Sequence, residues 1–182
     1  MRSGQILPKP VQPIFVRLLC KMRIRMRDNH LFIFEMDFAD TLRCIPMVVR
    51  MKLDLCGVKL SLRQWSHFTV AERNGLIKHP VESLNERAAY RARLLQLIRM
   101  QAGEEPKFLP VVNSGVWQKS DTVPDIILET ARLFGEQEPT PDQWCSLSPL
   151  QRFALIKLTR PGHDNLNFVP AMREFFNTGL RQ

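Results

Sequence analysis

The sequence predicts an all-α fold, a compact helical bundle that contains an internal duplication of a three-helix unit. Capping signals and glycines bound apolar stretches of helical spacing, which indicates short helices. Two separate segments share the same order of these signals. The chain has 182 residues, of which 45% are hydrophobic and 24% charged. Such a composition is typical of a globular domain with a buried core.

The net charge of +8 is concentrated at the beginning of the chain. Residues 1–27 hold seven basic and no acidic residues, so residues 28–182 hold the other 19 basic residues (26 minus 7) against 18 acidic ones. This near-neutral body lacks the basic surface typical of nucleic-acid binding. Residues 1–30 are expected to be a basic leader. Three interpretations of this leader stay open: a disordered arm, a product of an upstream start codon, or a targeting segment.

Residues 31–182 are expected to form a single helical domain. At its beginning, residues 31–38 alternate in part between apolar and polar side chains. This pattern indicates a short strand or an extended segment that lies on the helices. The sequence offers no convincing second strand to pair with it.

The duplicated unit spans about residues 45–80 and 123–159. Two prolines and two glycines recur at an offset of 78, and after one inserted residue a tryptophan and an arginine recur at an offset of 79. The chain has only three tryptophans, so their matching positions are informative. We therefore expect architectural roles for the recurring residues Pro46, Gly57, Trp65, Arg73, Pro124, Gly135, Trp144 and Arg152.

Each unit is expected to contain a helix, a glycine stop, a short helix with the tryptophan, and a further helix. Proline suits the first turn of the opening helix, and glycine its left-handed end. Capping boxes then begin the next two helices. In the sequence they are Ser61 to Gln64 and Thr69 to Glu72 in the first unit, and Thr140 to Gln143 and Ser148 to Gln151 in the second.

A longer helix is expected over residues 82–102, between the two units. Its predicted apolar face consists of Leu84, Ala88, Leu95, Ile98 and Ala102. Gly103 and Pro106 are expected to end this helix, and residues 104–122 to form a loop. After Pro170 we expect a short C-terminal helix.

The sequence contains no glycine loop for phosphate, no helical His pair with Glu and no nucleophile elbow. We therefore predict no enzyme activity, catalytic residue, metal site or cofactor. No apolar run has the roughly 18 residues of a membrane span. The four cysteines form no CxxC pair, which indicates a reduced, cytoplasmic protein.

The densest polar segment runs from residue 43 to residue 59. Several of its side chains have no counterpart of similar chemistry in the second unit, so they are candidates for binding a partner: Arg43, Cys44, Arg50, Lys52, Asp54, Cys56 and Lys59. The alternative is two buried thiols beside a charged helix face, with Arg50 and Asp54 as an i,i+4 pair. The two thiols lie about 18 Å apart along a straight helix and could not jointly bind a metal there.

Residues 32–65, and most specifically residues 42–65, closely resemble the family of nitrate-reductase-associated proteins. The resemblance begins near Phe32 and runs to the C-terminus. This family is typical of cyanobacteria and some other bacteria, near genes for assimilatory nitrate reductase and molybdenum-cofactor synthesis. The resemblance implies a non-catalytic accessory role in the maturation, assembly or activity of a cytoplasmic, molybdenum-dependent nitrate reductase. It offers no catalytic residues to carry over.

Two other hypotheses remain open. The chain could be a small redox or cofactor carrier that uses Cys44 or Cys56. It could also bind nucleic acid through its basic leader.

Overall fold

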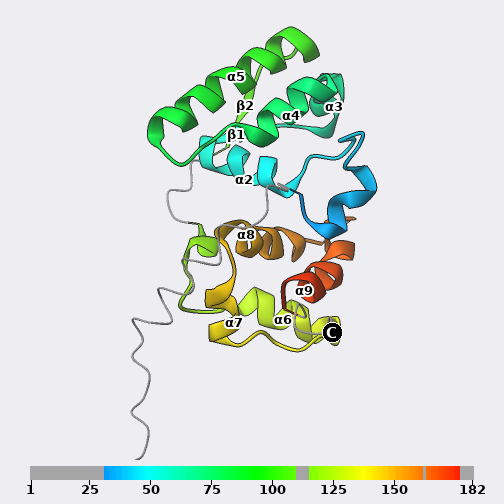
Figure 1. Cartoon of the computed structure of the whole chain (residues 1–182), viewed down its shortest axis with the longest axis vertical. Coiled ribbons are helices and arrows are strands. Elements are labelled where there is room, and N and C mark those ends of the chain that lie inside the picture. Colours follow the sequence, from blue (N-terminus) through cyan, green and yellow to red (C-terminus); the bar gives the residue numbers. More distant parts are fainter. Residues whose placement is uncertain (1–30, 110–114, 162, 177–182) are drawn as a thin grey trace, which may run out of the picture.

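The computed structural model describes residues 31–109, 115–161 and 163–176, so the predicted leader lies outside the described residues. The helices form two halves that are stacked along the long axis of the molecule (Figure 1). The first half contains α2 (Met47–Cys56), β1 (Val58–Lys59), α3 (Leu62–His67), α4 (Val70–Lys78), α5 (Leu84–Ala102) and β2 (Lys107–Phe108). The second contains η3 (Val116–Gln118), α6 (Asp125–Leu133), α7 (Pro141–Ser146), α8 (Pro149–Leu158), η4 (His163–Asn167) and α9 (Phe168–Phe176).

The prediction of a mostly helical fold is confirmed. Helices α2, α3 and α4 follow one another as α6, α7 and α8 do in the other half. This common order is what a duplication would produce, but the duplication itself stays a prediction. All four predicted capping boxes are present, with both reciprocal hydrogen bonds in each.

The glycine and proline positions are close to those expected. Gly57 (φ 63°) directly follows α2, and Gly135 (φ 67°) comes two residues after the end of α6. Both adopt the left-handed conformation that glycine accepts without strain. Pro46 and Pro124 precede the first turn instead of lying in it, because each is the extended N-cap residue of its helix.

The recurring tryptophans and arginines tie each unit to the chain before it. Trp65 and Trp144 are fully buried, and their indole N–H groups donate to the carbonyls of Leu42 (2.6 Å) and Lys119 (3.1 Å). Arg73 donates four hydrogen bonds to backbone carbonyls. Arg152 donates to the carbonyls of Trp117 and Leu147. Buried N–H donors need such partners, which gives these side chains an architectural role.

Of three expectations about local structure, two are wrong and one holds in part. Residues 31–38 are not extended, since Ile33–Phe38 form the 3₁₀ helix η2. Residues 104–122 are not entirely a loop, because β2 pairs antiparallel with β1 and η3 follows. The predicted apolar face of α5 is only partly right: Ile98 is buried, together with Tyr90, Leu94 and Leu97, whereas Leu84 is 81% exposed.

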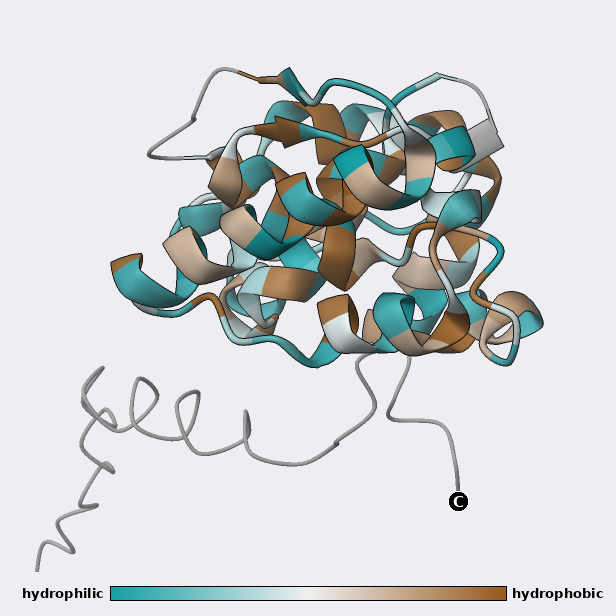
Figure 2. Cartoon of the chain, turned by 90° about the horizontal axis from the view of Figure 1, so that it is seen from above, coloured by the Kyte–Doolittle hydropathy of each residue, from teal (hydrophilic) through white to brown (hydrophobic). Residues whose placement is uncertain are grey.

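The two halves have separate hydrophobic cores. One core joins residues of α2 to α5, and the other joins residues of α6 to α9 with Met47 from α2. Leu150 of α8 packs against both cores. Seen from above, the hydrophobic segments concentrate towards the centre of the stacked helices (Figure 2). Helices α2 and α8 therefore form the junction between the halves.

Within the described residues, no helix combines the length and the apolar character that crossing a bilayer requires.

Candidate functional site: a groove at the junction of the two halves

The largest group of polar candidates surrounds a pocket of about 300 Å³ at the junction between the halves. The first half supplies α2, β1 and the segments beside them, and the second half supplies the C-terminal end of α8. The described residues that line this pocket are Cys44, Ile45, Arg50, Leu53, Asp54, Val58, Lys59, Leu60, Leu62, Leu109, Lys157 and Arg160. The pocket thus combines apolar walls with several charged groups.

An ion pair joins the two halves at this pocket. The Lys157 ammonium lies 2.7 Å from the Asp54 carboxylate, and the two side chains are 15% and 32% exposed. The sequence suggested an i,i+4 pair of Asp54 with Arg50, and the structure places Lys157 beside Asp54. The Nε of Arg50 donates to the carbonyl of Ile45 (3.1 Å). The pair between Lys157 and Asp54 joins α8 to α2 in a partly dry setting, where charge pairs are stronger than at the surface.

Among the described residues, two other cations of this pocket have no acidic partner. Lys59 on β1 and Arg160 just after α8 are both exposed, and within the described ranges neither forms an ion pair. The exposed Lys107 of β2 lies directly opposite Lys59 in the sheet. Like charges that face each other across an antiparallel pair repel. This edge of the pocket therefore has a positive potential.

A smaller hollow of about 150 Å³ shares Asp54, Lys157 and Arg160 with the pocket. Its apolar wall includes the half-exposed Val116 and the indole of Trp117, whose ring packs edge-on against Phe153 (5.7 Å). A Cβ atom on Gly115 would lie 2.2 Å from the indole nitrogen of Trp117, so this turn requires glycine. We call the pocket and this hollow together the junction groove.

Five of the seven candidate residues are accessible at the surface, fully or in part. Cys44, Arg50, Asp54 and Lys59 line the groove. Arg43 lies outside it, where its guanidinium pairs with Asp37 (2.7 Å). The structure therefore brings four candidates together with Lys157 and Arg160, which the sequence did not single out for function.

Lys52 and Cys56 lie in the interior of the first half. The Lys52 ammonium donates to the carbonyls of Leu76, Ile77 and His79 (3.3, 2.6 and 2.6 Å), which closes the end of α4. Burial lowers the pKa of Lys52 to about 8. Burial also raises the pKa of the Cys56 thiol, whose Sγ donates to the carbonyl of Arg87. A buried, protonated thiol is a poor nucleophile and a poor metal ligand.

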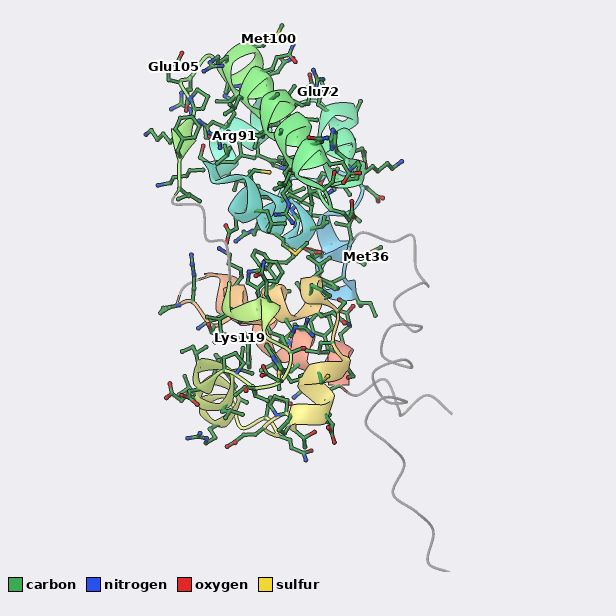
Figure 3. All side chains as sticks on the ribbon, turned by 90° about the vertical axis from the view of Figure 1, so that its left-hand side faces the viewer. Met36, Glu72, Arg91, Met100, Glu105 and Lys119 are labelled. Atoms are coloured by element: carbon green, nitrogen blue, oxygen red, sulfur yellow. The ribbon has the colours of Figure 1, made fainter. Side chains whose placement is uncertain are left out.

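Glu35 is a buried carboxylate at the beginning of α2, and the sequence did not single it out for function. Glu35 of η2 is 3% exposed and accepts hydrogen bonds from the backbone N–H groups of Met47 (2.7 Å) and Phe32 (3.1 Å). It therefore supplies the cap that Pro46 cannot give to the beginning of α2. Burial is the main reason why the pKa of Glu35 rises to about 7, and the two N–H donors oppose the rise. Figure 3 shows Met36, the next residue of η2, at the level of the junction.

The sequence gave weak signals for these additional residues. Glu35 interrupts an apolar run. Glutamate is rarely buried without partners, so its position in such a run is unusual. Lys157 ends a Leu-Ile-Lys sequence that residues 76–78 share with residues 155–157. Arg160 and Trp117 carried no signal, because their roles depend on contacts between distant segments.

The groove has features of a binding surface. Cations without acidic partners attract carboxylates, and the apolar walls accept hydrophobic side chains. Within the described residues, no group of three or more His, Cys, Asp or Glu side chains is arranged to hold a metal ion.

Comparison with known proteins gives one match. The family model described as conserved nitrate reductase-associated protein matches residues 31–175. This match begins where the sequence resemblance does and contains every residue of the groove. Searches of curated proteins and of solved structures found no match. Because the family model covers most of the sequence, the chain belongs to the family of conserved nitrate reductase-associated proteins.

Proposed function

We propose that this chain is a non-catalytic accessory protein that binds a cytoplasmic, molybdenum-dependent assimilatory nitrate reductase and assists its maturation, assembly or activity. Family membership over residues 31–175 carries the proposal, since the family is described by its association with nitrate reductase. The junction groove adds support, because its mixture of charged and apolar groups resembles the composition of protein interfaces.

Within this proposal, the seven candidates have two kinds of role. Cys44, Arg50, Asp54 and Lys59 contact the reductase in the groove, and Arg43 lies at its margin. Lys52 and Cys56 act indirectly, since they are buried where α2 packs against the neighbouring helices.

A genetic and a biochemical experiment together test the proposal. A deletion strain grown on nitrate should show reduced nitrate reductase activity, and the complete chain on a plasmid should restore it. A tagged chain isolated from the same nitrate-grown cells should co-purify the reductase. Normal activity in the deletion strain, together with no co-purified reductase, would reject the accessory role.

A second candidate function, a small Cys-based redox or cofactor carrier, depends on Cys44. Its thiol is partly exposed and lines the groove. This version predicts that the purified chain carries a chromophore, a stoichiometric metal or a pterin, and that Cys44→Ser fails to complement the deletion. Full complementation by Cys44→Ser from a chain without such a group would exclude it.

A further inference from the structure

We infer that the junction groove docks an acidic segment of the partner protein whose carboxylates are flanked by apolar side chains. The inference rests on the proposed function, and it specifies the chemistry of the contact and the residues that make it.

The positive charge of the groove favours an acidic partner. Lys59 and Lys107 face each other across the two-stranded sheet, and Arg160 lines the same pocket as Lys59. No acidic group within the described ranges pairs with any of the three. A carboxylate placed near Lys59 and Lys107 would relieve their mutual repulsion and gain charge-assisted hydrogen bonds. Complementary charge of this kind also raises the rate of association.

The second argument is the arrangement of apolar surface around Arg160. In the pocket, Leu62 is 54% exposed and Leu109 36% exposed. In the hollow, Val116 is 54% exposed and lies beside Trp117. Arg160 lines both the pocket and the hollow, so it is shared by two sites that each have exposed apolar side chains. An acidic side chain with apolar neighbours could bind Arg160 while those neighbours contact the apolar side chains of the pocket and of the hollow.

The complementary charge is expected to come from another molecule. Residues 1–30 carry seven basic side chains and a single acidic one, Asp28, and residues 177–182 carry no acidic side chain. A second copy of the chain could offer the acidic residues of α6, α7 and the segment between them: Asp125, Glu129, Glu136, Glu138 and Asp142. The experiment below therefore includes self-association as an outcome.

Charge reversal in the complete chain tests the inference. Lys59→Glu/Arg160→Glu changes two cations of the groove. The control Lys78→Glu/Arg93→Glu makes the same change in net charge at exposed positions of α4 and α5 that do not line the groove. Lys59→Glu also places opposite charges across the sheet, so the groove variant should fold. Circular dichroism and a thermal melt verify the fold of both variants.

We expect the groove variant to capture at least about tenfold less nitrate reductase than the wild type. The control variant should stay within about twofold. Wild-type capture should also weaken as salt is raised, because the contact involves exposed charges.

The remaining outcomes separate this inference from the proposed function. No capture by the wild-type chain would reject the proposed function itself. Equal capture by the wild type and the groove variant would overturn the inference while the proposed function stands. A wild-type dimer that the groove variant abolishes, with reductase capture unchanged, would assign the groove to a second copy and would also overturn the inference.

Discussion

At the scale of single residues, three charged side chains bind backbone groups at helix ends that belong to other elements. Glu35 caps the beginning of α2 from a different element, and Lys52 closes the end of α4 in the same way. A third such contact joins α9 to η2, where Glu174 accepts from the N–H groups of Ile33 (3.0 Å) and Phe34 (3.4 Å). Each contact satisfies backbone groups at a helix end that no neighbouring residue caps.

The pKa of Glu35 makes stability depend on pH. Its value in the folded chain is about 7, above the ordinary value of 4.5. Between these two values the folded chain holds a proton that the unfolded chain has released, so stability falls as pH rises through this window and is level above it. From pH 5 to pH 8, the loss should be roughly 2–3 kcal/mol in the free energy of unfolding.

Urea unfolding of the wild type and Glu35→Gln at both pH values checks this expectation. Glutamine can still accept the Met47 N–H bond but does not ionise. The difference in unfolding free energy between the two proteins should therefore change with pH, to the disadvantage of the wild type at pH 8. Parallel pH profiles would show that the ionisation of Glu35 does not govern stability.

At the scale of elements, the helices follow from local signals. A capping box lies within four residues, so Ser61 to Gln64 and Thr140 to Gln143 are readable from the sequence. The left-handed glycines after α2 and α6 are local signals too. The bounds of these helices were therefore predictable to within one or two residues.

Arg73 allows a test at this scale, because its guanidinium joins α4 to the chain before α2. Nε donates to the carbonyl of Trp65 (3.1 Å), and the Nη atoms donate to those of Thr41, Leu42 and Ser66 (2.9, 3.1 and 2.9 Å). Lysine has one nitrogen and cannot reach all four carbonyls. Arg73→Lys should therefore lower the free energy of unfolding by about 1–3 kcal/mol in a urea titration.

The matched control is Arg63→Lys in α3, where the arginine side chain is 81% exposed and lies 3.8 Å from Glu104. This change should stay within about 0.5 kcal/mol. If the two substitutions cost the same, the carbonyl contacts of Arg73 do not contribute to stability as described.

At the scale of the whole molecule, the part that was not predictable depends on distant contacts. Ile33–Phe38 form a 3₁₀ helix whose first N–H groups donate to Glu174, about 140 residues away. The buried face of α5 depends on how α2 and α3 pack against it. Spacing alone therefore selected Leu84, which is exposed, in place of the buried Leu94 and Leu97. The two units have helices in the same order, but this order does not determine how the units meet.

The groove also depends on contacts between distant segments of the chain. Asp54 and Lys157 belong to different halves, and nothing in the spacing of their neighbours indicates a pair. Comparing the two units did select four residues of the groove, because the polar side chains present in only one unit lie where α2 meets the other half. These residues are Cys44, Arg50, Asp54 and Lys59. The comparison also selected Lys52 and Cys56, since sequence alone does not distinguish a buried charge or thiol from an exposed one.

The central claim is that this chain binds nitrate reductase directly. Its most direct test is the affinity of the purified, complete chain for purified nitrate reductase, measured separately for the apo and the molybdenum-loaded enzyme. The account predicts a saturable complex with at least one of the two forms, with a Kd of about micromolar or tighter. No measurable binding to either form would contradict it.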